Sequence, residues 1–151
     1  MKSLYADEPS LDTTNYFREV EYIKIFIGSS SKSKIYCDEI ASMLQDLEYT
    51  PVLWSEDDVF IAGRITWDSL AEKFSTVDAG VFVIAPDDCL DTGVKVARDN
   101  VWIELGLMAG QKGIDNTAIF RTDNSVHIPS DCNGITRIDY SNQCRQLKKN
   151  E

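Results

Sequence analysis

The stretch RDNVWIELGLMAGQKG, residues 98–113, is the part of the sequence around which the rest of the chain is organised. Within it, residues 101–110 are all apolar or glycine except Glu104. Asp99 or Asn100 is expected to cap the N-terminus of a helix here, because either side chain can accept hydrogen bonds from the free amides of the first turn. Glu104 then lies within about two turns of the capped end, where the helix dipole favours negative charge.

A lone carboxylate on an apolar helix is chemically informative, because its ionised form must be paired, reach water or raise its pKa. Asn100 and Glu104 are four residues apart and share one helical face, whereas Val101, Leu105 and Met108 share a neighbouring face. A carboxylate at the rim of an apolar wall is a candidate catalytic group. A solvent-facing Glu104 on a helix buried on its other sides is the alternative, and spacing does not separate the two.

Length and charge narrow the class of protein. The 151 residues, 43% hydrophobic and 26% charged, suit one globular domain with a single core. The net charge of −10 disfavours binding to nucleic acids and to anionic membranes. No apolar run reaches the roughly 20 residues of a membrane span, and the N-terminus lacks the features of a signal peptide. We expect an N-terminal extension at residues 1–20, one domain at 21–141, and a C-terminal tail or the start of a linker at 142–151.

The cysteines indicate the cellular compartment and argue against a metal site. Cys37, Cys89, Cys132 and Cys144 form no Cys-x-x-Cys pair, and His127 offers no zinc-type spacing. Reduced thiols in a cytoplasmic protein are the expected state, and no metal is expected. A nucleophilic cysteine acting with His127 is a minor alternative, because nothing in the sequence brings the two side chains together.

Apolar runs and helical periodicities alternate along the chain. Strands are predicted at residues 22–28, 51–54, 79–85, 117–120 and 134–140, with helices near 36–47, 67–77 and 98–113. Nearly unbroken apolar strands that alternate with helices are typical of a parallel sheet covered on both faces. We therefore predict an α/β fold with a five-stranded parallel sheet and helices on both faces.

The carboxyl ends of parallel strands meet at one edge of the sheet, and ligands bind beyond that edge in folds of this kind. Four segments are expected to converge there, at residues 28–31, 54–57, 86–88 and 98–104. This edge is therefore where we look for a binding site.

The first of these segments, Gly28, Ser29, Ser30 and Ser31, runs from a strand toward a helix. Small residues and amides at a helix start can hold a phosphate, although the segment carries neither a dinucleotide nor a Walker fingerprint. An ordinary turn and helix cap explains the same residues, so both interpretations stay open.

Aromatic and basic side chains near the same edge are further candidates. Trp54 and Phe60 can stack on a flat ring, or they can belong to the core and to the packing of their own loop. Lys32, Arg64 and Arg98 can neutralise ligand phosphates, or they can form surface ion pairs in a chain this acidic.

Asp87 and Asp88 follow the third predicted strand after a proline. Both are interpreted as turn formers rather than metal ligands, because no third carboxylate completes a metal site. Asp87 lies at the ligand-binding edge and is counted among the candidate substrate-binding residues.

Several segments occur together and in an order that resembles the TIR-like domains of bacterial anti-phage effectors, including those fused to STING-like or other cyclic-nucleotide sensors. The segments are IFIGSSS at 25–31, LWSEDDVFIAG at 53–63, SL at 69–70, VFVIAPDD at 81–88, RDNVWIELGLMAG at 98–110 and GITRIDY at 134–140. The likeness covers roughly residues 22–140 and is most specific in the RDNVxxELGL block.

The resemblance implies a flavodoxin-like TIR fold that cleaves NAD+ into nicotinamide and a linear or cyclic ADP-ribose product. It places the catalytic glutamate of the family on Glu104. Many TIR enzymes carry a tryptophan four residues before that glutamate, whereas this chain has Asn100, as the effector subgroup does. Asn100 is therefore counted as a substrate-binding candidate, with Trp54 and Phe60 expected to flank the rings.

The expected chemistry uses NAD+ as the substrate and needs no cofactor. The nicotinamide–ribose bond breaks through an oxocarbenium-like centre, which one carboxylate can stabilise. The resemblance also implies activation by self-association of TIR domains and a cyclic-nucleotide sensor as a domain or partner protein. A nucleoside deoxyribosyltransferase-like enzyme and a noncatalytic TIR signalling scaffold are the alternatives.

Overall fold

The computed structural model describes residues 22–53 and 66–140. Its strands are β1 (Lys24–Gly28), β2 (Thr50–Leu53), β3 (Ala79–Ile84), β4 (Asp88–Cys89), β5 (Lys95–Val96), β6 (Thr117–Arg121), β7 (Val126–His127) and β8 (Thr136–Asp139). The helices are α1 (Lys34–Asp46), α3 (Thr66–Ser75) and α4 (Asp99–Lys112), with 3-10 turns at η2 (Ser31–Ser33), η3 (Ile114–Asn116) and η4 (Ser130–Cys132). In these two ranges, no helix is long and apolar enough to cross a membrane.

The main sheet contains five strands in the order β2-β1-β3-β6-β8, and every neighbouring pair is parallel. β3 is the central strand, and β1 lies between β2 and β3, so that Ile27 pairs with Leu53 of β2 on one side and with Val81 of β3 on the other. Each of the five predicted strands is present within two residues of its expected bounds. This arrangement confirms the predicted flavodoxin-like α/β fold.

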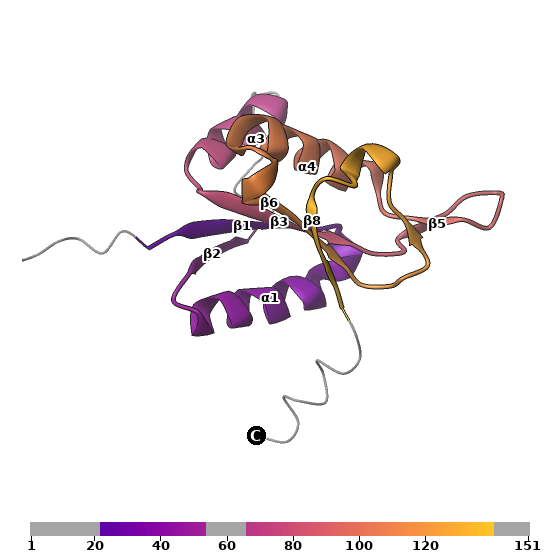
Figure 1. Cartoon of the computed structure of the whole chain (residues 1–151), viewed down its shortest axis with the longest axis horizontal. Helices are drawn as coiled ribbons and strands as arrows, with labels where there is room; N and C mark the ends of the chain where they lie inside the picture. The colour runs from indigo at the N-terminus through magenta and orange to yellow at the C-terminus, as the bar shows by residue number, and fades with distance from the viewer. Residues whose placement is uncertain (1–21, 54–65, 141–151) are drawn as a thin grey trace, which may run out of the picture.

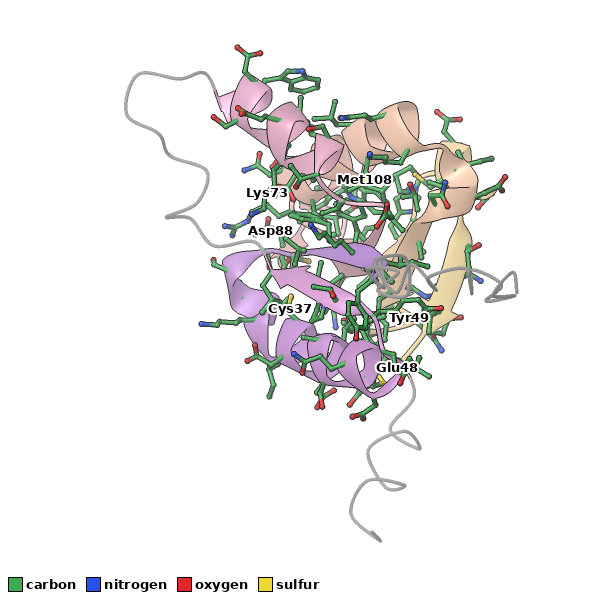
Figure 2. All side chains as sticks on the ribbon, turned by 90° about the vertical axis from the view of Figure 1, so that its left-hand side faces the viewer. Cys37, Glu48, Tyr49, Lys73, Asp88 and Met108 are labelled. Atoms are coloured by element: carbon green, nitrogen blue, oxygen red, sulfur yellow. The ribbon has the colours of Figure 1, made fainter. Side chains whose placement is uncertain are left out.

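Helices cover both faces of the sheet, but unequally (Figure 1). α3 and α4 pack on one face around a buried cluster that includes Phe26, Phe74, Phe82 and Met108. The rings of Phe26 and Phe74 meet edge to face with their centroids 4.9 Å apart. α1 packs on the other face around a smaller cluster that includes Cys37. Figure 2 shows Met108 and Cys37 on opposite sides of the sheet.

Close packing explains the glycine at the end of β1. β1 becomes more buried toward Gly28, and β3 is fully buried at Phe82 beside it. A Cβ atom on Gly28 would lie 2.7 Å from Phe82 Cδ1, closer than two such carbon atoms approach in proteins. Gly28 is therefore required by the packing of the neighbouring strand, whatever it contributes to a ligand.

A small second sheet, which the sequence pattern does not predict, lies beyond the carboxyl ends of β3 and β6. β4 pairs antiparallel with β5, and β5 pairs parallel with β7. Each of these strands is two residues long, too short to show a hydrophobic period. The β4–β5 segment projects from the side of the molecule (Figure 1). Its pairing with β7 anchors the loop after β3 to the chain that follows β6.

Candidate active site

Asp87, which follows β3, forms hydrogen bonds with the other segments that meet at the carboxyl edge of the sheet. Its Oδ1 accepts a hydrogen bond of 2.8 Å from the hydroxyl of Ser30, in the loop after β1. Its Oδ2 accepts a longer bond of 3.5 Å from the backbone N–H of Arg98, at the start of α4. Its carbonyl oxygen accepts from Lys32 Nζ at 2.9 Å. The predicted convergence of these three segments is confirmed, and a carboxylate lies at its centre.

The serine hydroxyls of the loop after β1 are engaged within the protein. Cys37 Sγ donates to Ser29 Oγ at 3.0 Å, and Ser29 Oγ donates to the carbonyl of Ser30 at 2.9 Å. The Ser30 side chain is buried and already bound to a carboxylate. A phosphate at this loop would therefore meet the exposed residues Ser31 and Lys32, or the backbone.

Two members of this network, Ser33 and Cys37, are not found by sequence reasoning. The Ser33 hydroxyl is buried, 3.4 Å from Ser30 Oγ and 3.5 Å from Asp87 Oδ1. Burial raises the pKa of the Cys37 thiol, which favours a protonated, structural thiol over a nucleophile. Helical spacing places Cys37 on the buried face of α1, but its hydrogen-bond partner comes from the loop before the helix.

Lys32 and Arg98 both reach the carboxylate of Asp88. Lys32 Nζ lies 3.8 Å from Asp88 Oδ1, and Arg98 Nε lies 3.7 Å from Asp88 Oδ2. All three side chains are more than a third exposed, and exposed ion pairs contribute only about 0–1 kcal/mol to stability. The interpretation of these cations as surface ion-pair partners is confirmed. The weakness of the pairs leaves both cations accessible to an anionic ligand.

The predicted capping of α4 by Asp99 or Asn100 is wrong. The N-cap residue is Arg98, which makes no side-chain capping bond, and the helix begins at Asp99. The Asp99 carboxylate accepts only a local bond of 2.9 Å from the next amide, Asn100 N–H. Asp87 supplies the acceptor for the Arg98 amide from a different loop. A tertiary contact therefore takes the place of the local cap at this helix start.

Glu104 is partly buried on α4, beside the face formed by Val101, Leu105 and Met108, which is buried as predicted. Its Oε2 atom is buried and has no hydrogen-bond partner among the described residues. Desolvation raises the pKa of Glu104 from 4.5 to about 7. The sequence leaves three possibilities for this carboxylate: an ion pair, contact with water, or a raised pKa. The structure supports the raised pKa. A fully solvent-facing Glu104 is excluded.

The remaining candidates divide between described and undescribed parts of the chain. Trp54, Phe60 and Arg64 lie outside the described residues, so their roles stay predictions. Asn100 is exposed in the first turn of α4, one turn before Glu104. The described part of the site therefore consists of the Asp87 network at the start of α4 and of Glu104. The Arg98 and Glu104 positions are separated by about 9 Å along the helix axis, at 1.5 Å per residue.

Asp87→Asn is expected to lower the free energy of unfolding by about 1–3 kcal/mol, because a charged acceptor shared by two donors is lost. The amide NH2 group of asparagine would face either the Ser30 hydroxyl or the Arg98 N–H and leave that donor unpaired. Urea unfolding measures the change. Asp88→Asn is the matched control, expected to change stability by no more than about 0.5 kcal/mol because its ion pairs are exposed. Equal unfolding midpoints for the two variants would contradict the bridging role of Asp87.

Residues 24–142 match the family described as CAP12/Pycsar effector protein, TIR domain. Relatives include a CD-NTase-associated protein 12 from Lachnospiraceae bacterium (strain RUG226), 33% identical over 120 residues. The Pycsar effector protein PaPycTIR from Pseudomonas aeruginosa is 30% identical over 120 residues. The alignments cover 78% and 77% of this chain but 37% and 39% of those proteins. The chain therefore spans well under half the length of these relatives.

A solved structure of similar fold is a 2-deoxyribosyltransferase from the psychrotolerant bacterium Bacillus psychrosaccharolyticus, with a TM-score of 0.55. The match covers 82% of this chain and 89% of that one at 16% identity, so the likeness concerns the fold alone. The family match, by contrast, is one of sequence, and it contains Asp87, Arg98 and Glu104. The chain therefore belongs to the TIR-domain family of CAP12/Pycsar effector proteins, as the resemblance of its motifs predicts.

Proposed function

We propose that this domain cleaves the nicotinamide–ribose bond of NAD+ and releases nicotinamide and an ADP-ribose product. The observation that carries the proposal is the buried Oε2 of Glu104, to which no described residue donates a hydrogen bond. A pKa of about 7 means that the ionised carboxylate is poorly stabilised in the free protein. A cationic ligand, or a cation that develops during a reaction, would supply the missing stabilisation.

The chemistry of NAD+ suits a site with a single carboxylate. The nicotinamide ring is already cationic, so its departure as neutral nicotinamide requires no acid. The electron pair of the breaking bond goes to the ring nitrogen, and positive charge develops on the ribose carbon and ring oxygen. Ionised Glu104 stabilises that charge or holds the ribose hydroxyls. Water then adds to the same carbon and loses a proton, which gives ADP-ribose; attack by another group of the same molecule gives a cyclic product.

Binding of the two phosphates has to overcome the charge of the protein. The net charge of −10 repels NAD+ at long range, although salt screens this repulsion beyond roughly 8–10 Å. Local donors must therefore hold the ligand. Lys32 and Arg98 are the candidates in the described structure, because both lie at the same edge of the sheet in weak, exposed ion pairs with Asp88, although Lys32 also donates to the carbonyl of Asp87. Ser31 precedes Lys32 in the exposed part of the loop.

The biological role that we propose is that of an effector domain in bacterial anti-phage defence. Its relatives are named CD-NTase-associated protein 12 and Pycsar effector protein, and the chain matches the TIR domain of that family. The expected partner is a cyclic-nucleotide sensor, as part of a longer chain or as a separate protein. The sensor would gather TIR domains and so raise their activity by self-association.

Release of free nicotinamide tests the activity directly. The purified chain is incubated with NAD+ over a range of protein concentrations, and also after clustering on a multivalent support, and nicotinamide is measured by chromatography. Parallel incubation with a deoxynucleoside and a second free base tests for deoxyribosyl transfer. Nicotinamide release supports the proposal. Base exchange without nicotinamide release would favour a transferase, and no product from clustered protein would favour a noncatalytic scaffold.

The rate of NAD+ cleavage is expected to rise with pH through about 7, because Glu104 must be ionised to act. The profile of kcat/KM follows the pKa of the free protein, whereas that of kcat follows the pKa in the substrate complex. The nicotinamide cation favours the ionised carboxylate, so the rise in kcat should lie at lower pH than the rise in kcat/KM. A flat kcat/KM between about pH 6 and 8 would contradict the assignment, since ionisation there should control the rate.

A further inference from the structure

The carboxylate of Asp88 lies between two cations at the carboxyl edge of the sheet. Its Oδ1 atom is 3.8 Å from Lys32 Nζ, and its Oδ2 atom is 3.7 Å from Arg98 Nε. Each carboxylate oxygen therefore faces one positive charge. A phosphate group between the same two cations would present its oxygens in a similar way, because it is also an anion with several acceptor oxygens. Asp88 belongs to β4, at the base of the segment that projects in Figure 1.

The neighbouring residue, Asp87, contacts both cationic residues independently of Asp88. The carbonyl oxygen of Asp87 accepts a hydrogen bond from Lys32 Nζ at 2.9 Å. Its carboxylate accepts from the backbone N–H of Arg98 at 3.5 Å and from the Ser30 hydroxyl at 2.8 Å. Asp87 is therefore part of the framework that places the two cations, whereas Asp88 supplies a negative charge between them.

The contacts of Asp88 with the two cations are weak enough for a ligand to replace them. Both distances exceed the roughly 2.7–2.9 Å of a direct hydrogen bond between charged groups. The Asp88 side chain is 49% exposed, so its carboxylate can turn into water without being buried on the way. A diphosphate carries more negative charge than a single carboxylate and therefore attracts the two cations more strongly.

We propose that Asp88 occupies the position of the ligand's diphosphate in the free protein and is displaced when the ligand binds. The inference rests on the proposed function, in which Lys32 and Arg98 hold the phosphates of NAD+. Asp88 then acts as an internal competitor that lowers the affinity of the site for nucleotides with a diphosphate. In the free protein its carboxylate also reduces the repulsion between the two cations, which is a physical reason for an acid at this position.

Isothermal titration calorimetry of the whole chain with ADP-ribose measures this competition without any cleavage, because ADP-ribose carries the diphosphate and lacks nicotinamide. Asp88→Asn removes the competing charge and keeps the shape of the side chain. Its Kd for ADP-ribose should be about five- to tenfold lower than that of the wild type. The difference should shrink as the salt concentration rises, because salt screens the interactions of exposed charges.

Two further variants separate competition from a general effect of charge. Asp91→Asn is the matched control, because it removes one negative charge from an exposed residue of the same projecting segment, and it should bind ADP-ribose like the wild type. In a Lys32→Gln background, the gain from Asp88→Asn should fall to less than about twofold, because Asp88 then competes for only one cation. Simple repulsion between Asp88 and the ligand would leave that gain unchanged.

Equal or weaker binding of ADP-ribose by Asp88→Asn than by the wild type would overturn the inference. An equal gain in Asp91→Asn would overturn it too, because net charge alone would then explain the change, and so would a failure of all these proteins to bind ADP-ribose at millimolar concentration. Nicotinamide release is measured separately. The expected order of Kd values without nicotinamide release would refute the proposed reaction alone, whereas nicotinamide release with equal Kd values would refute the role of Asp88 alone.

Discussion

Glu104→Gln is expected to lower the rate of NAD+ cleavage by at least about a hundredfold, which corresponds to roughly 2.7 kcal/mol of lost transition-state stabilisation. Glutamine keeps the shape of the side chain and removes the charge that the developing ribosyl cation needs. The loss should fall on kcat more than on KM, since the charge matters most in the transition state. Nicotinamide release by clustered protein, under conditions where the wild type is active, measures the effect.

Glu48→Gln is the matched control for this variant. It makes the same chemical change at an exposed glutamate that follows α1, on the other side of the sheet from α4 (Figure 2). Its rate should equal that of the wild type. A Glu104→Gln variant that retains activity within about tenfold of the wild type, a difference of roughly 1.4 kcal/mol, would show that Glu104 is not the catalytic carboxylate.

The same substitution is expected to stabilise the fold at pH above about 7. Folding raises the pKa of Glu104 from 4.5 to about 7, so the folded state binds more protons than the unfolded state between these values. The wild type therefore loses stability as the pH rises through this window. The full loss is about 3 kcal/mol, at roughly 1.4 kcal/mol for each pKa unit. Glutamine does not titrate and avoids the loss.

Urea unfolding of the wild type and Glu104→Gln at several pH values measures this difference. The variant should be more stable by about 2–3 kcal/mol near pH 8 and by less than about 1 kcal/mol near pH 5. Glu48→Gln should show no such divergence with pH. A Glu104→Gln variant that is less stable than the wild type near pH 8 would mean that the carboxylate has a stabilising partner in the folded protein.

Together the two expected results describe a site that is kept at a cost to stability. Burial disfavours the charged form of the carboxylate needed for the proposed reaction and raises its pKa, whereas hydrogen bonds lower the pKa of the Asp123 and Asp139 carboxyls. Loss of activity together with a gain in stability is the pattern expected of a functional group held in an unfavourable environment. Replacement of a purely structural glutamate would instead lower stability and leave the activity of the folded protein unchanged.

Much of the fold was predictable from the sequence alone. The runs YIKIFIG and AGVFVIA indicate buried parallel strands, and the spacing of apolar residues places Val101, Leu105 and Met108 on one buried helix face. These features are local and periodic, so the chain displays them directly. The isolation of Glu104 in an apolar helix is also visible in the sequence, and so is the resemblance of its motifs to TIR domains.

The contacts of the site were decided only by the tertiary structure. Asp87 accepts from Ser30 and Arg98, which are 57 and 11 residues away along the chain, and it displaces the local cap expected from Asp99. Such hydrogen-bond partners are brought together by the connections between strands and helices. Local structural propensity and residue spacing carry no information about these long-range contacts. The same holds for the two-residue strands of the small sheet, which exist only because their partners lie beside them.

The identity of the side chain that carries chemistry can be inferred from the sequence, because residue type and spacing along one helix are enough to single out a carboxylate on an apolar face. Whether that carboxylate is paired, reaches water or shifts its pKa depends on the folded structure. Water exclusion around Glu104 depends on how α4 packs on the sheet, and it raises the pKa to about 7 instead of pairing the charge. Desolvation is a property of the assembled surroundings, and the linear order of residues does not contain it.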